Sequence, residues 1–245
     1  MATNFYQAKH RGEAFSKSLL GSKANWHIFT NVFHVTGYTS CLYNEICQDQ
    51  EKENDHNYIQ DMRKIIATIN MTLDGFCDHT ATGAVDEILQ HYNELLNSAD
   101  TLLYGRITYQ LMETYWPSVV KSPTGNKAMD EFAVSIDNIS KLVYSRTLKN
   151  VDWKNTELKN EINKEELLKL KQQEGRDILA GSPGLIVRLM QLDLIDEYQL
   201  CVHPVVLGSG LPLFKNIKEK INLKLLKTKV FECGAVVLYY KPAKE

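Results

Sequence analysis

Hydrophobic and polar positions follow two alternating periods from Met62 to the end of the chain. The residues from Arg63 to Asn70 are rich in β-branched side chains, which favour a strand, and the turn pair Asp74-Gly75 follows them. Between Val85 and Leu96 the apolar residues recur at helical spacing. The same change of period is repeated along the chain, so the pattern predicts strands that alternate with helices.

The same reasoning predicts further strands at residues 100–104, 141–144, 177–180 and 198–206. It predicts further helices at residues 106–115, 127–136 and 165–173, and one more that begins at Pro183. The helix from residue 106 is expected to stop at Trp116-Pro117, because proline lacks the N–H that a helix interior needs. Residues 223–231 and 235–240 predict a β-hairpin that turns at Glu232-Cys233-Gly234.

Together these elements indicate an α/β fold with a mostly parallel central sheet flanked by helices and an antiparallel C-terminal hairpin. The first strand is expected to lie centrally in the sheet. Residues 62–245 are therefore interpreted as one domain.

Residues 1–61 differ from the rest and show no sustained apolar period. They hold four of the seven histidines and two of the five cysteines, without the spacing of a metal site, so no metal is predicted. The polar run 48–55 is typical of a solvated linker. We interpret residues 1–61 as a poorly ordered N-terminal extension. The alternative is an accessory segment that packs on the main domain through the apolar residues of 26–35.

Composition and charge exclude several partners. The formal net charge is −2, which gives no sign of attraction to nucleic acid or to a membrane surface. No apolar run approaches the roughly 18 residues that span a bilayer, and the N-terminus lacks the pattern of a signal peptide. The five cysteines contain no C-x-x-C pair. A cytoplasmic protein with free thiols is the simplest interpretation.

The segment Gly181-Ser182-Pro183-Gly184 is a candidate phosphate site. It follows a predicted strand and precedes a helical pattern, with Ser182 suited to the N-cap and Pro183 to the first helical position. The N–H groups of Gly184 and Leu185 would then point out of the positive end of a helix, which attracts phosphate. The alternative interpretation is an ordinary capped helix.

Two other strand ends carry similar residues. Gly105 and Arg106, with Thr108, lie where a strand is expected to enter a helix, and Ser145-Arg146 follows the strand that ends at Tyr144. Ligands of open α/β sheets bind beyond the carboxyl ends of the strands, so three such ends on neighbouring parallel strands predict one crevice for a phosphate-bearing cofactor. Neither GxGxxG nor GxxxxGK is present, which argues against an ordinary Rossmann site and a P-loop ATPase.

Five ordered blocks between Met62 and about Lys241 resemble the dihydrofolate reductase superfamily. They include Met71–Phe76, Leu103–Tyr109 with Tyr115-Trp116-Pro117, Ser145–Leu148, Gly181-Ser182 with Leu194–Tyr198, and His203–Gly210 with Pro212–Phe214. The order of these blocks is similar to stand-alone relatives of the reductase domain of the bifunctional riboflavin-pathway deaminase-reductase. One departure is Ala180, because the riboflavin-pathway enzymes carry an acidic residue directly before a Gly-Gly pair at this place.

The resemblance implies an oxidoreductase that uses NADPH to transfer a hydride to a pteridine- or pyrimidine-like ring, with 5-amino-6-(5-phosphoribosylamino)uracil as one candidate. By position, Ala67, Leu73 and Gly75 would lie near the nicotinamide, and Gly105, Arg106 and Thr108 near the pyrophosphate. Ser145 and Arg146 would hold the adenosine 2′-phosphate, and Gly181, Ser182, Gly184 and Leu185 would complete the phosphate cradle. The resemblance also implies a homodimer, which the apolar runs 200–207 and 236–240 support.

Asp74 is the candidate catalytic residue, because it is the acid inside a matched loop near the expected hydride site. It would hydrogen-bond or protonate a ring nitrogen of the substrate. The alternative is that Asp74-Gly75 is simply a turn. Trp116 likewise either forms a wall of the substrate pocket or fills the core at a helix end. A different class of function also stays open, namely a non-catalytic nucleotide-binding or scaffold domain that retains the fold.

Overall fold

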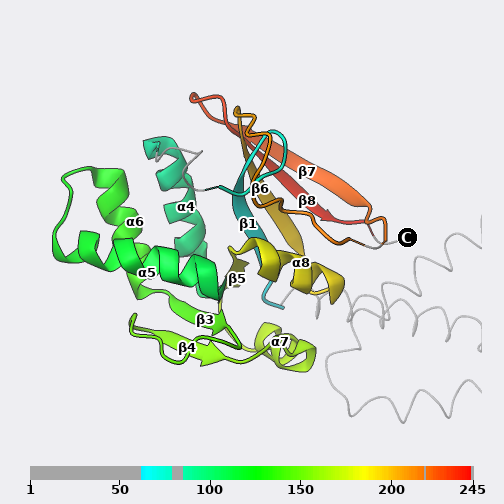
Figure 1. Ribbon diagram of the computed structural model, residues 1–245, viewed down its shortest axis with the longest axis horizontal. Helices are drawn as coiled ribbons and strands as arrows, with labels where there is room; N and C mark the ends of the chain where they lie inside the picture. The colour runs from blue at the N-terminus through cyan, green and yellow to red at the C-terminus, as the bar shows by residue number, and fades with distance from the viewer. Residues whose placement is uncertain (1–61, 79–84, 218, 244–245) are drawn as a thin grey trace, which may run out of the picture. The chain divides into compact units, whose positions relative to one another are not determined.

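The computed structural model describes residues 62–78, 85–217 and 219–243. The prediction that residues 1–61 form an extension therefore lies outside the described residues. The described residues form one eight-stranded sheet and five helices (Figure 1). Their order along the chain is β1 (Ile65–Thr72), α4 (Asp86–Ser98), β2 (Ala99–Gly105), α5 (Arg106–Lys121), α6 (Lys127–Asn138), β3 (Ser140–Tyr144), β4 (Thr156–Lys159), α7 (Lys164–Lys171), β5 (Asp177–Ala180), α8 (Pro183–Gln191), β6 (Glu197–His203), β7 (Leu223–Val230) and β8 (Val236–Pro242).

The strand order across the sheet is β4-β3-β2-β5-β1-β6-β8-β7. Every neighbouring pair from β4 to β6 is parallel, and β8 pairs antiparallel with both β6 and β7. The first strand is central, as expected, since β5 and β6 flank it and Ile66 pairs with Leu179 on one side and Glu197 on the other. The predicted fold class is thereby confirmed.

Alternate residues of the central strands face two helical layers, because successive side chains of a strand point to opposite sides. Ile66, Leu102 and Leu179 pack with α4, α5 and α6 on one face. Ile65, Leu103 and Ile178 pack with α7 and α8 on the other face. The central strands are therefore covered on both faces, as the parallel part of a sheet requires.

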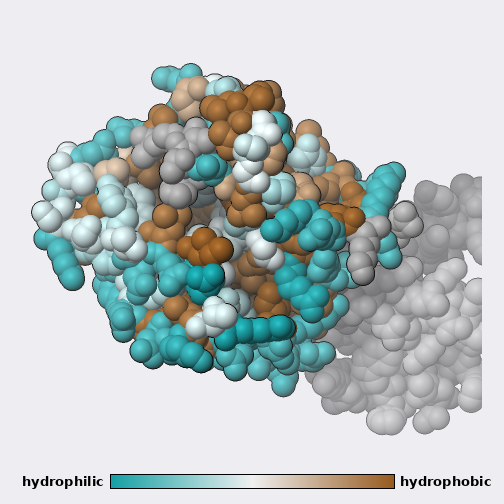
Figure 2. Space-filling view, viewed as in Figure 1, coloured by the Kyte–Doolittle hydropathy of each residue, from teal (hydrophilic) through white to brown (hydrophobic). Residues whose placement is uncertain are grey.

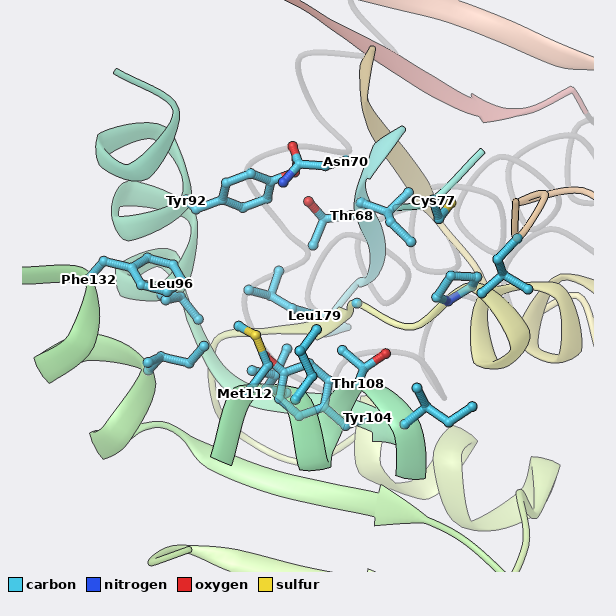
Figure 3. A pocket seen from close by; sticks show the side chains of 18 residues that line it. Thr68, Asn70, Cys77, Tyr92, Leu96, Tyr104, Thr108, Met112, Phe132 and Leu179 are labelled. Atoms are coloured by element: carbon cyan, nitrogen blue, oxygen red, sulfur yellow. The ribbon is translucent and has the colours of Figure 1, made fainter. Parts of the chain in front are cut away.

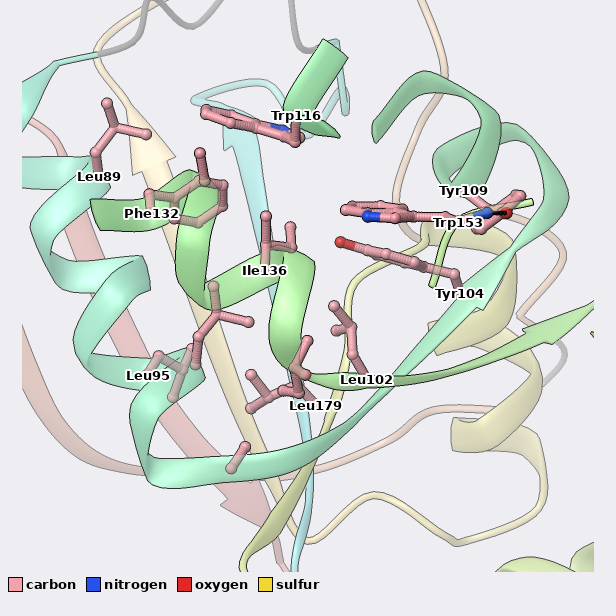
Figure 4. Packing of buried hydrophobic residues seen from close by; sticks show 14 of the residues in the cluster. Leu89, Leu95, Leu102, Tyr104, Tyr109, Trp116, Phe132, Ile136, Trp153 and Leu179 are labelled. Carbon is pink, nitrogen blue, oxygen red and sulfur yellow. Dashed lines mark hydrogen bonds between the residues drawn. The ribbon is translucent and has the colours of Figure 1, made fainter. Parts of the chain in front are cut away.

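Aromatic side chains fill the layer between the sheet and α5 and α6 (Figure 4). The rings of Trp116 and Phe132 meet edge to face with their centres 4.5 Å apart, and Trp116 is only 9% exposed. Trp116 thus belongs to the core. Trp153 and Tyr109 belong to the same cluster, with their ring centres 6.3 Å apart (Figure 4).

Helix α5 does not stop at Pro117, contrary to the sequence-based expectation, but runs on to Lys121. Trp116 and Val119 are both buried in the core, so tertiary packing holds the last turn in spite of the missing N–H. The Ser118 hydroxyl also donates to the Tyr115 carbonyl over 2.6 Å.

Two strand assignments also differ from the prediction. Strand β4 was not expected, because its four residues, Thr156–Lys159, show too short a pattern to be distinguished from a loop. Strand β6 ends at His203 rather than at residue 206, since Pro204 cannot donate a ladder hydrogen bond.

The C-terminal hairpin forms as predicted, and Gly234 turns the chain with a φ of +84°. Strand β6 lies between β1 and β8, and β8 lies between β6 and β7. The apolar side chains of β6 and β8 therefore lie within the sheet and not at a free edge. Within the run 200–207, Val206 and Leu207 lie beyond the end of β6 and are exposed, and the homodimer stays a prediction.

Candidate functional site

The three strand ends that carry phosphate-suited residues lie next to one another. Strands β3, β2 and β5 are consecutive and parallel in the sheet, and β1 follows β5. Gly105, Ser145 and Gly181 consequently meet at the same edge, where an open α/β sheet binds its ligand.

Ser182 links two of these strand ends. It occupies the N-cap position of α8, as predicted, but its side chain does not cap that helix. Its hydroxyl instead accepts the backbone N–H of Gly105 over 2.9 Å, and the residue is only 4% exposed. Ser182 therefore fixes the end of β5 against the end of β2, a role that its local sequence does not reveal.

The helices that start at this edge, α5 and α8, differ from their neighbours at their N-termini. Neither has a side-chain cap or an acidic residue in its first turn. By contrast, α6 and α7 have asparagine caps and acidic first turns. The first N–H groups of a helix have no partner within it, so α5 and α8 keep a positive end that suits an anion.

The individual residues of these two termini offer different contacts. The Arg106 side chain is exposed and donates to Gln110 over 3.0 Å. Gly184 is exposed, with open space where a Cβ would be. The Leu185 side chain is buried, so this residue presents only its N–H. Backbone N–H groups and one guanidinium are thus the hydrogen-bond donors that these two termini offer.

The loop after β3 is ordered by Ser145, whose buried hydroxyl accepts the N–H groups of Thr147 and Leu148. Arg146 next to it is 81% exposed and lies 3.5 Å from Glu161, which is also exposed. Exposed pairs of this kind contribute little stability, so the guanidinium can exchange Glu161 for another anion.

Asp74 holds two loops together. Its carboxylate accepts the Thr72 hydroxyl over 2.6 Å and the N–H groups of Leu207 and Gly208. These hydrogen bonds, that from Thr72 above all, lower the pKa of Asp74, so the group stays ionised at neutral pH. The contacts favour the turn interpretation, with Gly75 beside it at a φ of +87°. A catalytic role for Asp74 stays a prediction.

A pocket of about 260 Å³ opens between the helical layer of α4, α5 and α6 and the carboxyl ends of β1 and β5 (Figure 3). Thr108 and Gly181 are the sequence-predicted residues that line it. An added Cβ on Gly181 would come within 3.3 Å of the Tyr104 ring, so glycine keeps the floor of the pocket open. The Ala67 side chain is completely buried in the layer under α8 and does not reach this pocket.

The pocket contains a polar cluster that the sequence analysis missed. Tyr92 donates to the Oδ1 atom of Asn70 over 3.0 Å, and the His203 ring lies 3.0 Å from the same oxygen. Burial lowers the pKa of His203 and raises that of Tyr92, so both side chains are neutral at pH 7. Figure 3 shows Asn70 and Tyr92 meeting at one end of the pocket, with Thr68 close to them.

Exposed apolar side chains gather on the loops that follow β1 and β6. Figure 2 shows hydrophobic surface, drawn in brown, in the upper part of the view. Leu73 is 66% exposed in the first loop, and Val206 and Phe214 are exposed in the second. The two loops are joined by backbone hydrogen bonds from Leu73 to Val205 and from Cys77 to Leu211. Of the residues in these joined loops, Cys77 and Leu211 line the pocket.

The part of the chain described by the structure has no helix long and apolar enough to cross a bilayer. Within the same residues, no three metal-ligating side chains come together.

The fold is that of the dihydrofolate reductases. Dihydrofolate reductase from Enterococcus faecalis, solved with NADP(H) and RAB-propyl, superposes with a TM-score of 0.50 at 14% identity, covering 74% of this chain and 97% of that one. A protein assigned to riboflavin biosynthesis in Shewanella sp. PV-4 superposes with a TM-score of 0.57 at 18% identity, covering 74% and 99%.

Within this class, the chain belongs to the RibD C-terminal domain family, whose model matches residues 63–237. The protein YyaP of Bacillus subtilis (strain 168) is 37% identical over 183 residues, which cover 73% of this chain and 94% of that protein. The family resemblance of the sequence motifs is thereby confirmed.

Proposed function

We propose that this protein is an NADPH-dependent reductase that transfers a hydride to a pteridine- or pyrimidine-like ring. The observation that carries the proposal is the shared edge of β3, β2 and β5, where two uncapped helix N-termini lie beside Arg106 and Arg146. Membership of the RibD C-terminal domain family supports the reaction class.

The residues present fit the phosphates of this cofactor. The N-termini of α5 and α8 suit the pyrophosphate, with Gly184 leaving the backbone accessible. Arg146 and Ser145 suit the adenosine 2′-phosphate at the end of the neighbouring strand. When bound, the reduced nicotinamide supplies the hydride, and the protein supplies position and a shielded pocket.

Asp74 serves this reaction in the proposal by fixing the loop that carries Leu73 and Gly75, which border the nicotinamide position. The ionised state of its carboxylate suits a hydrogen-bond acceptor better than a proton donor. The protein acts in the cytoplasm as a homodimer in this proposal, both features being supported by the sequence and the family alone.

The experiment is a cofactor titration of Arg146→Ala. A charge-assisted hydrogen bond to phosphate contributes about 1.5–3 kcal/mol, so the NADPH dissociation constant should rise roughly tenfold or more while that of NADH stays nearly unchanged. Lys149→Ala removes an exposed cation three residues away and should alter neither constant. Glu161→Gln frees Arg146 from its ion pair and should preserve NADPH affinity. Equal losses for both cofactors in Arg146→Ala would refute the assignment.

Turnover separates the proposal from its rival, a non-catalytic nucleotide-binding domain. NADPH oxidation with a panel of pterins, pyrimidines and quinones should show activity with at least one ring class. Cofactor binding without oxidation by any member of the panel would favour the rival.

A further inference from the structure

The pocket face of β1 changes from apolar to polar toward the end of the strand. Ile66 packs into the core under the helices, whereas Thr68 and Asn70, two and four residues later on the same face, line the pocket. Polar side chains under a helical layer need hydrogen-bond partners, because an unpaired buried polar group is destabilising.

Asn70 has its oxygen occupied and its nitrogen available. The Oδ1 atom takes the Tyr92 hydroxyl and the Nε2–H of the neutral His203 ring, which fills both of its lone pairs. The Nδ2 group keeps two N–H donors, and the described residues give it no hydrogen-bond acceptor. Asn70 therefore presents donors to a ligand.

Thr68 adds a second unused polar group beside Asn70. The residue is 7% exposed, and its buried Oγ1 atom makes no hydrogen bond of good geometry among the described residues, although it lies close enough to the Tyr92 hydroxyl to oppose the rise in the pKa of that group. A hydroxyl can both donate and accept, so it can pair with an N–H or a carbonyl of a ligand. Such an orphan group in the wall of a pocket indicates a partner that arrives with the ligand.

The rest of the lining excludes charge. The 18 described residues that line the pocket are apolar or neutral polar. A phosphate or carboxylate inside it would be desolvated without a counter-charge, which is strongly unfavourable. The volume of about 260 Å³ lies just below the range of sites for drug-sized ligands, so it suits a molecule of one or two rings.

We infer that Thr68 and Asn70 bind the amide edge of a flat, uncharged heterocycle, and that the substrate carries no phosphate into this pocket. The Asn70 amide donates to a ring carbonyl, and the Thr68 hydroxyl accepts the adjacent ring N–H. The apolar walls, among them Met112 and Phe132, cover the ring. This assignment rests on the proposed function, because it treats the pocket as the site of the hydride acceptor. It excludes phosphoribosyl-bearing rings as the preferred substrates.

Two matched pairs of probes test the inference by calorimetry on the full chain, with and without NADPH. Quinazolinedione and naphthalene share an outline, but only the first has an amide edge. Uracil and uridine monophosphate share that edge, but only the second carries a ribosyl phosphate. Quinazolinedione should bind at least tenfold more tightly than naphthalene, and uracil more tightly than uridine monophosphate.

Thr68→Val separates recognition from structure. It should weaken quinazolinedione binding about tenfold, as expected for one lost hydrogen bond. The melting temperature of the ligand-free variant should stay level or rise by about 2–4 °C, because a buried unpaired hydroxyl is removed. Thr101→Val is the matched control. The Thr101 hydroxyl is buried at the opposite end of the sheet and bonds Arg63 and Asp100, so this variant should lose stability and keep its affinity.

The inference fails if naphthalene binds as well as quinazolinedione, if uridine monophosphate binds more tightly than uracil, or if Thr68→Val keeps full affinity. These outcomes are independent of the cofactor. A protein that binds NADPH but shows none of the expected preferences keeps the proposed function and loses the inference. A protein that shows the preferences but neither binds nor oxidises NADPH loses the proposed function.

Discussion

Substitution of Ser182 tests whether this residue acts as a helix cap or as a link between two strand ends. Its hydroxyl accepts the Gly105 N–H over 2.9 Å and makes no hydrogen bond to the first turn of α8. Ser182→Ala leaves that N–H without its acceptor in a partly buried position, which costs about 1–2 kcal/mol. For a domain of this size the loss corresponds to a fall in melting temperature of about 3–6 °C.

Two further variants at the same position separate the roles. Asparagine and serine cap helices about equally well, and glycine is only a few tenths of a kcal/mol worse. A capping role therefore predicts that Ser182→Asn and Ser182→Gly are nearly neutral. A linking role predicts that both variants are less stable than the wild-type protein. Glycine lacks the hydroxyl that accepts the Gly105 N–H, and asparagine is larger than the serine that it replaces. Ser182 is only 4% exposed, so its position has little room for the larger asparagine side chain.

Urea unfolding followed by the fluorescence of the buried Trp116 and Trp153 measures these differences. Ser122→Ala, which removes an exposed hydroxyl just after α5, is the control and should change stability by no more than about 0.5 kcal/mol. The linking role is refuted if Ser182→Asn and Ser182→Gly both unfold at the wild-type urea concentration.

Three other predictions concern pH, chain length and assembly. Burial lowers the pKa of His91 to about 4, so the unfolded chain binds more protons between pH 4 and 6.5, and stability falls as pH falls through that window. Between pH 7 and pH 5 the free energy of unfolding of the wild-type protein should fall by about 2 kcal/mol, and His91→Phe should remove this fall. A variant with the same pH profile as the wild type would contradict the prediction. A chain that begins at Met62 should keep the fold and melt within about 5 °C of the full chain. A chain that begins at Ile65 loses the Arg63 contacts to Thr101 and Arg176 and should melt at a lower temperature. A fall of more than about 5 °C for the chain that begins at Met62 would show that residues 1–61 are packed. Light scattering at micromolar concentration should return a dimer, and a monomer would reject the proposed assembly.

The sequence by itself determined the fold class and predicted which strand ends would meet at one edge of the sheet. Strand and helix periods are local properties, and β5 occupies the predicted residues 177–180. Because parallel strands present their carboxyl ends at one edge, motifs after β2, β3 and β5 had to converge once those strands became neighbours. The polar residues of β1 were also visible, since Thr68, Asn70 and Thr72 alternate with apolar residues, but the pattern alone did not distinguish a pocket from solvent.

Only the tertiary structure decided which partners these residues meet. The Asn70 oxygen meets His203 across 133 positions of the chain, and Asp74 meets Gly208 across 134. Ser182 has the local sequence of a cap but bonds Gly105, and α5 continues through Pro117 because Trp116 and Val119 are buried. The physical reason is common to all of these cases. Strand order and helix packing bring distant groups together, and their energies exceed the local propensities by which a sequence is interpreted.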